Sequence, residues 1–344
     1  MKLCVVSPLY NGLYRYCKPL VELLKTNTDF EILHVGFDEI CFDKDKIITQ
    51  VDRVAKKIIE FSPDIIHYNF GTYDSEQLLP YMLEKNGFKG KSVLTYHSLQ
   101  LDLFKKLNCP DLDAISNEYM GKMDGMIFFT DYAKNIYKEK YPTLSKYVIS
   151  FHPATHENQT ISEQEKKFFE KEFDIDETKK NVALLGYASH WKESNSIVEL
   201  AKKHKDINFF IAGPYWADKV KKENPDTDIS TLTNLKVIDK ELNKKEFYFF
   251  VKTCVGFFPY HYYKSFQGSG LLPNYLLSGY PCLVNNISQL KEYCGENKYC
   301  FDFSNQELLN KRLTEIFDEK NLKKNKRFSY QNHLDDILNL YREI

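Results

Sequence analysis

Short, continuously apolar runs alternate with segments of helical periodicity along almost the whole chain, and this alternation constrains the fold more than any other feature. Before residue 153 the apolar runs are residues 2–7, 31–36, 64–70, 92–96, 125–129 and 146–151. After residue 180 they are residues 181–186, 207–212, 235–238, 254–258, 281–285 and 299–302. Continuous apolar runs are typical of parallel strands that are covered on both faces. The alternation therefore predicts two α/β domains, each with its own open parallel sheet.

The length of 344 residues exceeds one ordinary domain and suits two. We place an N-terminal domain at residues 1–155, a polar linker at 156–178 and a C-terminal domain at 179–326. Residues 327–344 form a predicted terminal helix with a single apolar stripe, made by Leu334, Ile337, Leu338 and Tyr341. Because this stripe must be buried, we expect the helix to pack back across a cleft between the domains.

Charge and cysteine usage exclude several classes of protein. The formal net charge is −1, from 47 Lys and Arg against 48 Asp and Glu, and a nucleic-acid binder usually has a basic excess. No apolar run reaches the roughly 18–20 residues of a membrane span. The eight cysteines form no Cys-x-x-Cys pair, which predicts reduced thiols and no structural zinc. We expect a cytoplasmic protein; peripheral contact with the inner face of the membrane and the oligomeric state stay open.

Ligands of open α/β sheets bind beyond the carboxyl ends of the strands, so the residues that follow each run are the candidate site residues. In the N-terminal half these residues are Tyr10, Asn11, Gly12, His67, Tyr68 and His97. Gly12 lies at a strand-to-helix turn, where backbone amides can approach an anion. The two histidines can hydrogen-bond sugar hydroxyls, although isolated histidines more often have structural roles, and His97 is favoured over His67 as a ligand group. The Gly-x-Gly-x-x-Gly fingerprint is absent, which argues against a nicotinamide dinucleotide.

In the C-terminal half, the candidate residues suit a diphosphate. Lys192 follows the run that ends at Gly186 and can place its ammonium group against phosphate. Gly213 makes a tight turn after the next run. A glycine-rich loop, made by Gln267, Gly268, Ser269, Gly270 and Leu271, precedes a predicted helix over 270–278. We expect the free amides near 269–272 and the positive end of the helix dipole to hold the diphosphate.

The order of these motifs resembles the retaining glycosyltransferases of family 4, which have the GT-B fold. The residues that carry the resemblance are Gly12-Leu13-Tyr14-Arg15-Tyr16, Asp64-Ile65-Ile66-His67, Thr95-Tyr96-His97, Gly186 with Lys192, Ile211-Ala212-Gly213-Pro214, and Ser269-Gly270 through Gly279-Tyr280-Pro281. The resemblance covers residues 1–305 in order. It implies two facing Rossmann-like domains, the first on the acceptor side and the second binding a nucleotide-sugar.

Three positions depart from the family pattern. Tyr187 stands where the family has an arginine beside the lysine. Phe266 and Asn274 stand where the family has a pair of glutamates eight residues apart. Asn274 can still hydrogen-bond a ribose, whereas Phe266 cannot act as a carboxylate. We expect the missing polar contacts to come from His261, Lys264 or Gln267.

The resemblance implies sugar transfer from a nucleotide-sugar to a saccharide, lipid-linked or other hydroxyl acceptor, with retention and without metal or another cofactor. The expected catalytic residues are Lys192, which stabilises the leaving diphosphate, and His97, which contacts the donor sugar. Aromatic residues after the early runs, namely Tyr10, Tyr14, Tyr68 and Tyr96, are expected to stack on acceptor sugars. Assembly of a glycan or a polysaccharide is the default role.

Two alternatives remain open at this point. One is a nucleotide-sugar binding or regulatory protein without turnover, which the missing glutamate pair motivates. The other is a nucleotide-sugar epimerase of the same fold. A metal-dependent transferase is not favoured, because the four Asp-x-Asp matches follow no clear strand.

Overall fold

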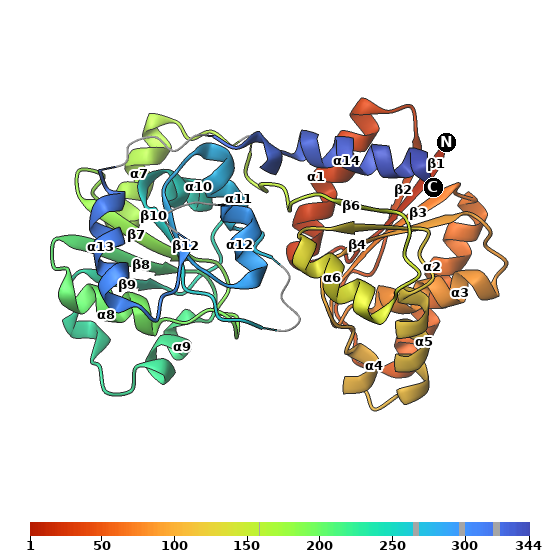
Figure 1. Ribbon diagram of the computed structural model, residues 1–344, viewed down its shortest axis with the longest axis horizontal. Helices are drawn as coiled ribbons and strands as arrows, with labels where there is room; N and C mark the ends of the chain where they lie inside the picture. Colours follow the sequence, from red (N-terminus) through yellow and green to blue (C-terminus); the bar gives the residue numbers. More distant parts are fainter. Residues whose placement is uncertain (158, 264–267, 296–299, 319–323) are drawn as a thin grey trace. The chain divides into compact units, whose positions relative to one another are not determined.

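The chain divides into two compact units in the computed structural model, which describes residues 1–157, 159–263, 268–295, 300–318 and 324–344. Unit 1 contains Met1–Pro153 and the C-terminal Tyr330–Ile344. Unit 2 contains Ala154–Tyr263 and Ser269–Ser329. Each unit has its own sheet and its own helices (Figure 1).

Unit 1 is built on a parallel sheet of six strands with the order β2-β1-β3-β4-β5-β6. The strands are β1 (Lys2–Val6), β2 (Glu31–Val35), β3 (Ile65–Phe70), β4 (Lys91–Tyr96), β5 (Gly125–Phe128) and β6 (Tyr147–Ile149). The strand order reverses direction between β1 and β3, and ligands of such sheets bind outside the carboxyl ends at this switch point.

The helices of unit 1 cover both faces of this sheet. They are α1 (Asn11–Asn27), α2 (Lys44–Phe61), the 3₁₀ turn η1 (Ser75–Leu78), α3 (Leu79–Lys85), α4 (Leu103–Lys106), α5 (Pro110–Met120), α6 (Asp131–Lys140) and α14 (Tyr330–Glu343). Side chains of a strand point alternately to the two faces. Tyr68 accordingly lies in the core beside α2 and α3, whereas His67 lies on the other face and contacts Tyr341 of α14.

Unit 2 repeats the plan with a second parallel sheet, in the order β12-β11-β10-β7-β8-β9. The strands are β7 (Lys180–Leu185), β8 (Ile207–Ala212), β9 (Leu235–Ile238), β10 (Val255–Phe258), β11 (Cys282–Asn285) and β12 (Cys300–Phe301). The two parallel six-stranded sheets confirm the predicted α/β fold class.

The helices of unit 2 pack on this sheet through a core rich in phenylalanine. They are α7 (Glu163–Phe173), α8 (Asn195–Lys203), α9 (Trp216–Glu223), η2 (Ile229–Thr231), α10 (Lys244–Thr253), α11 (Leu272–Ser278), α12 (Ser288–Cys294), α13 (Gln306–Ile316) and η3 (Lys326–Phe328). In that core Phe173 of α7 packs on Phe249 and Phe250 of α10. The predicted helix over 270–278 begins two residues later, at Leu272.

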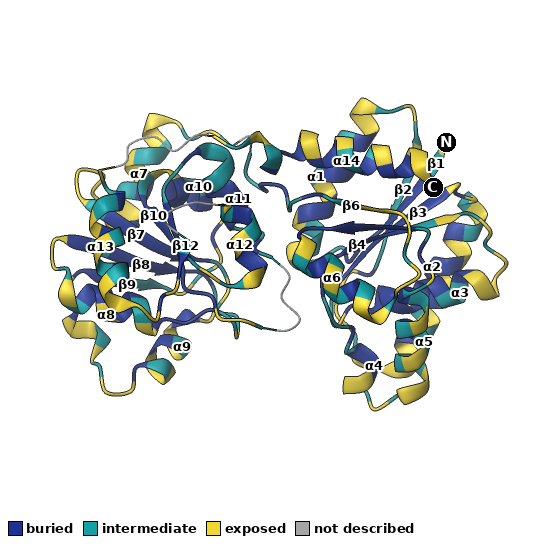
Figure 2. Ribbon diagram, in the orientation of Figure 1, coloured by how far each residue is buried: buried dark blue, intermediate teal, exposed yellow. Residues whose placement is uncertain are grey.

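The buried residues concentrate in the strands and on the inward sides of the helices (Figure 2), and most of them are apolar. All eight cysteines are free thiols, and Cys4, Cys254 and Cys282 are buried. Among the described residues, no helix is both long enough and apolar enough to cross a membrane.

Candidate functional site

The loop after β7 begins at Gly186, whose surroundings leave no room for a side chain. Gly186 has a φ of +87° and donates its amide hydrogen to Ala212. A Cβ atom there would lie 2.6 Å from Leu271 Cδ1 and 2.9 Å from Lys192 Nζ. Glycine at this position therefore allows Leu271 and the Lys192 ammonium to approach the end of β7.

Lys192 itself is a buried cation. Only 5% of the residue is exposed, and its Nζ donates to the carbonyl oxygen of Leu185 at 2.9 Å. The Nζ also lies 5.4 Å from the centre of the Tyr260 ring. Within the described residues no carboxylate forms an ion pair with it, and burial lowers the pKa of Lys192 to about 7. An ammonium has three donors, so this geometry leaves capacity for an anion.

Gly213 brings the loop after β8 against the loop after β7. Its φ is +148°, and a Cβ atom there would lie 2.2 Å from the carbonyl oxygen of Gly186. That oxygen accepts a hydrogen bond from Trp216 Nε1 at 2.6 Å. Gly213, Gly186 and Lys192 are therefore brought together at the carboxyl edge of the second sheet, as the sequence predicts, and Tyr187 projects from the same edge with 42% of its surface exposed.

The glycine-rich segment differs from its prediction in one respect. Ser269 is buried, and its Oγ accepts hydrogen bonds from the amides of Leu271 at 3.2 Å and Leu272 at 3.1 Å. The prediction that these two amides are free for a diphosphate is wrong, because the serine hydroxyl satisfies them inside the protein. Gly268 and Gly270 flank this serine and are partly exposed. The predicted contacts Gln267 and Lys264, together with Phe266, lie outside the described residues.

Asn274 has a structural role instead of the ribose contact that the sequence predicts. Its side chain is buried, and Nδ2 donates to the carbonyl oxygens of Gly270 and Leu271, each at 3.1 Å. Its Oδ1 accepts from the backbone amide of His156 at 3.0 Å. Both ends of the amide group thus hold the start of α11 and the segment around His156 in place. His261 is exposed, and its backbone amide donates to the carbonyl oxygen of Trp191.

In unit 1, His97 lies directly after β4 and is partly exposed. Its Nε2 donates to Asn69 Oδ1 at 3.1 Å, and its ring makes edge contacts with Tyr16 and Phe129. Burial, with the nearby His152 as the next cause, holds the pKa of His97 well below its usual value. The ring is therefore neutral near pH 7 and able to hydrogen-bond an uncharged group.

His67 and Tyr68 do not line a ligand site. The chain continues as strand to Phe70, so both residues lie inside the sheet. His67 is fully buried between Thr95 Oγ1, at 2.7 Å, and Tyr341 Oη, at 2.6 Å. The predictions that His67 and Tyr68 contact a sugar are therefore wrong. Tyr96 is also a core residue, packed on Phe128 and Tyr137, so its predicted stacking on sugar is wrong as well.

A pair of carboxylates that sequence reasoning missed lies at the carboxyl edge of the first sheet. Asp74 accepts from Tyr10 Oη at 3.1 Å and from the amide of Gly71 at 2.6 Å. Glu76 accepts from the amide of Phe37 at 2.9 Å. The signal was present in the sequence, because two acidic residues closely follow the third apolar run.

The environment of this pair favours protonation. Both side chains are buried, and Glu76 Oε2 has no hydrogen-bond partner among the described residues. Burial and the charge of Asp74 raise the pKa of Glu76 to about 8. Burial also raises the pKa of Asp74. Tyr10 is partly exposed above them, and Gly12 is exposed in the first turn of α1. The side chain of Asn11 lies outside the described residues.

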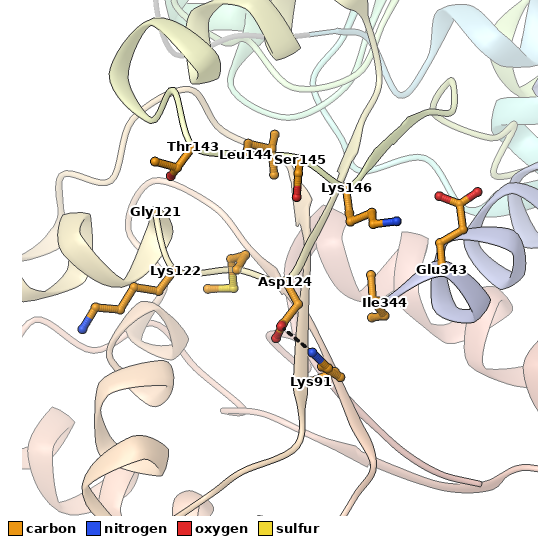
Figure 3. Close-up of a pocket in the computed structure, with 11 residues that line it drawn as sticks. Lys91, Gly121, Lys122, Asp124, Thr143, Leu144, Ser145, Lys146, Glu343 and Ile344 are labelled. Carbon is orange, nitrogen blue, oxygen red and sulfur yellow. Dashed lines mark hydrogen bonds and ion pairs between the residues drawn. The ribbon is translucent and has the colours of Figure 1, made fainter.

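A cavity of about 370 Å³ in unit 1 is lined by residues that precede or begin strands and by the C-terminal Glu343 and Ile344 (Figure 3). Lys91 begins β4, Asp124 precedes β5 and Lys146 precedes β6. Lys91 and Asp124 form an ion pair at 3.0 Å across it. These positions place the cavity at the amino-terminal edge of the sheet, opposite the loops that carry His97 and Tyr10, so we do not assign the site to it.

The sequence matches no family model and no curated protein sequence at a significant level. Solved structures do match. Sucrose-phosphate synthase from Thermosynechococcus elongatus has a TM-score of 0.74 and 11% identity, over 100% of this chain and 98% of that one. A glycosyltransferase from Rickettsia africae has a TM-score of 0.69 and 16% identity, over 99% and 98% of the two chains.

A third match is a UDP-GlcNAc 2-epimerase from Neisseria meningitidis, solved with UDP-GlcNAc bound. It has a TM-score of 0.67 and 13% identity and covers 100% of both chains. At these identities the matches establish the fold alone. The chain has a two-domain α/β fold of the GT-B kind, which glycosyltransferases and UDP-GlcNAc 2-epimerases share.

Proposed function

We propose that this chain is a glycosyltransferase that moves a sugar from a nucleotide-sugar to a hydroxyl of a saccharide or lipid-linked acceptor. The observation that carries the proposal is Lys192, a buried ammonium at the carboxyl edge of the second sheet with one carbonyl partner and, within the described residues, no carboxylate. Burying a cation without an anion is costly, and a bound diphosphate would offset that cost. The transferases among the structures of the same fold support the same conclusion.

The chemistry follows from charge. When the glycosidic bond to the donor phosphate breaks, negative charge grows on the leaving diphosphate. Lys192 would stabilise this charge more strongly in the transition state than in the bound substrate, which is the condition for catalysis. Because a protein cation performs this task, the proposal requires no metal ion. We also propose that the configuration at the transferred sugar carbon is retained, because the family that the sequence resembles consists of retaining enzymes.

We propose that the acceptor binds to unit 1. His97 offers a neutral imidazole beside Asn69, which suits contact with a sugar hydroxyl. Tyr10 offers a partly exposed ring and a hydroxyl that Asp74 holds in place. These two residues remain candidates for sugar contact after His67 and Tyr68 are removed from the predicted set.

The experiment compares wild type with Lys192→Met, using a panel of nucleotide-sugars and measuring release of the nucleoside diphosphate. We expect the variant to lose at least about a hundredfold in turnover, as for removal of one charge-stabilising donor elsewhere. Lys252→Met is the matched control, because Lys252 is an exposed lysine of the same unit. Circular dichroism and the melting temperature establish that both variants are folded. Unchanged turnover in Lys192→Met would refute the mechanism.

Epimerisation of a nucleotide-sugar is the second candidate, and the buried Asp74 and Glu76 pair favours it. Inverting a carbon centre requires groups that remove and return a proton, and carboxyls with raised pKa values suit that task. Chromatography of the nucleotide-sugar incubated without acceptor separates the cases. An epimerase forms an isomeric nucleotide-sugar, a transferase requires an acceptor, and a regulatory binder gives binding without product.

A further inference from the structure

Three loops at the carboxyl edge of the first sheet are joined by hydrogen bonds. Leu9, after β1, donates its amide hydrogen to the carbonyl oxygen of Phe37, after β2, at 2.8 Å. The amide of Phe37 donates in turn to Glu76 Oε1 at 2.9 Å. Tyr10 Oη donates to Asp74 Oδ1 at 3.1 Å. The two carboxyl groups after β3 therefore hold the backbone and the hydroxyl of the loop after β1, and we call these five residues the loop cluster.

The position of the loop cluster in the fold suits ligand binding. Tyr10 follows β1 and Asp74 follows β3, and the strand order of the sheet reverses between these two strands. The bond from Tyr10 to Asp74 thus crosses the switch point, where open α/β sheets bind ligands. Asp74 is 6% exposed and Glu76 is fully buried, whereas Tyr10 is partly exposed. Tyr10 is therefore the side chain of this pair of bonds that a ligand can reach.

The hydrogen bonds of the two carboxyl groups show which of them holds a proton. Both oxygens of Asp74 accept, Oδ1 from Tyr10 and Oδ2 from the amide of Gly71 at 2.6 Å. In Glu76 only Oε1 accepts, and the buried Oε2 has no partner among the described residues. Neighbouring buried carboxyl groups resist ionising together. The proton of the pair therefore belongs on Glu76 Oε2, and Asp74 remains a carboxylate.

An ionised Asp74 fixes the polarity of the Tyr10 hydroxyl. A carboxylate can only accept hydrogen bonds, so the single hydrogen of Tyr10 Oη is used in the bond to Asp74. The phenol oxygen then has only lone pairs left, and no donor among the described residues is bonded to it. Polarisation by the carboxylate strengthens this oxygen as an acceptor. Tyr10 can therefore accept a hydrogen bond from a ligand but cannot donate one.

We propose that Tyr10 is a specificity residue for the acceptor, which must present a hydroxyl hydrogen to Tyr10 Oη, and that Asp74 and Glu76 are positioning residues that fix this polarity. The inference rests on the proposed function and names the acceptor class, a neutral saccharide with a free hydroxyl at the recognised position. An acidic sugar with its anionic group at this place is disfavoured, because the Asp74 carboxylate lies directly behind the phenol.

Saturation-transfer NMR tests the inference on the full-length protein, with dissociation constants from titration. The probes are the methyl glycosides of glucose, galactose, mannose and N-acetylglucosamine, with that of glucuronic acid as the anionic member. We expect a neutral glycoside to bind more tightly than the glucuronide. Each hydroxyl of the bound glycoside is then replaced by fluorine, which cannot donate. At one position the replacement should weaken binding about 3-fold to 10-fold, the usual contribution of one hydrogen bond.

Two variants separate contact from polarity. In Tyr10→Phe the glycoside and its fluorinated analogue should bind equally. In Asp74→Asn the side-chain oxygen must face the amide of Gly71, so its NH₂ group faces Tyr10 and the phenol becomes a donor. The preference for hydroxyl over fluorine should then shrink, whereas a merely structural role of Asp74 would weaken both ligands alike and keep the preference. Tyr147→Phe is the matched control, because Tyr147 is a 37% exposed tyrosine of the same unit.

Circular dichroism establishes that the variants are folded, and the fluorine series on wild type decides the outcome even if one of them is not. Binding of no glycoside, tighter binding of the glucuronide, or equal binding of every fluorinated analogue by wild type would overturn the inference. A preference that is unchanged in Tyr10→Phe or in Asp74→Asn would do the same. The proposed function fails separately, if Lys192→Met releases nucleoside diphosphate as fast as wild type.

Discussion

Two histidines on neighbouring strands of unit 1 have different environments because of where their strands end. His67 lies inside β3, where Thr95 and Tyr341 occupy both of its ring nitrogens. His97 lies directly after β4, where one ring nitrogen is bonded to Asn69 and the residue is partly exposed. Because β3 continues for three residues beyond His67, this histidine is part of the core and is not available to a ligand.

Lys192 gives the first residue-scale prediction. Burial lowers its pKa to about 7 in the unliganded protein, and a bound diphosphate would raise that pKa again. Binding of a nucleotide-sugar at pH 8 should therefore take up close to one proton, and affinity should fall by up to about tenfold per pH unit above 7. Calorimetry in buffers of different ionisation enthalpy measures the uptake. Uptake that persists in Lys192→Met would assign the proton to another group.

Glu76 gives a prediction for stability. Its pKa is raised to about 8 in the folded protein, above the usual value of 4.5, so the folded state holds a proton that the unfolded state releases. The contribution of this group is therefore fully present below pH 4.5 and is lost as pH rises towards 8, with a slope of about 1.4 kcal/mol per pH unit.

Glu76→Gln should accordingly stabilise the protein more at pH 8 than at pH 5, as measured by urea unfolding at both values. Glu84→Gln is the control, because Glu84 is exposed on α3. Equal effects of Glu76→Gln at the two pH values would contradict the raised pKa.

At the scale of elements, α14 is attached to unit 1 by hydrogen bonds as well as by its apolar stripe. Ser150 Oγ donates to Asp336 Oδ2, so it accepts from His333 Nδ1, and Tyr16 Oη therefore donates to His333 Nε2. His333 is fully buried, and this pattern fixes its neutral tautomer. The sequence predicts the apolar stripe of α14, but not the polar groups that fix its register on α1 and β6.

Four histidines of unit 1 with lowered pKa values predict instability in acid. Burial lowers the pKa of His67 to about 3 and that of His152 to about 4, and it holds those of His97 and His333 well below their usual values. Between pH 6.5 and these values the unfolded chain binds protons that the folded chain excludes. Stability should therefore fall with pH below 6.5, by about 1.4 kcal/mol per pH unit for each histidine.

Urea unfolding between pH 7 and pH 5 measures this slope. His67→Gln keeps hydrogen-bonding groups but cannot titrate. The free energy of unfolding of this variant should therefore change with pH by about 1.4 kcal/mol per pH unit less than that of wild type, which corresponds to one proton. His190→Gln, at an exposed position, is the matched control. Glu76 opposes the histidine slope by about one proton over this range, so the comparison with wild type is decisive: equal slopes in wild type and His67→Gln would contradict the lowered pKa of His67.

At the scale of the whole molecule, α14 belongs to unit 1 although it follows unit 2 in the sequence. Its buried residues are Tyr330, His333, Leu334, Ile337, Leu340 and Tyr341. Each large apolar side chain that loses its burial costs about 1.5–3 kcal/mol, so several together approach the stability of an ordinary domain. Deleting residues 330–344 should therefore unfold unit 1 and leave unit 2 folded.

Hydrogen exchange measures this outcome strand by strand. Amides of β1 to β5 should lose protection in the deletion variant, and those of β7 to β11 should keep it. Protection retained in both sheets would show that unit 1 is stable without α14.

The sequence by itself determined the two parallel sheets, because the continuous apolar runs and the helical stripes between them are local patterns. It also placed Gly186, Gly213 and Lys192 together, since the ends of neighbouring parallel strands share one edge. Only the tertiary structure decided that the side chains of Asn274 and Ser269 form hydrogen bonds within the protein and that His67 contacts α14. It also decided that Asp74 and Glu76 are buried, with raised pKa values. Hydrogen-bond partners and desolvation depend on residues distant in the sequence, and no local pattern encodes them.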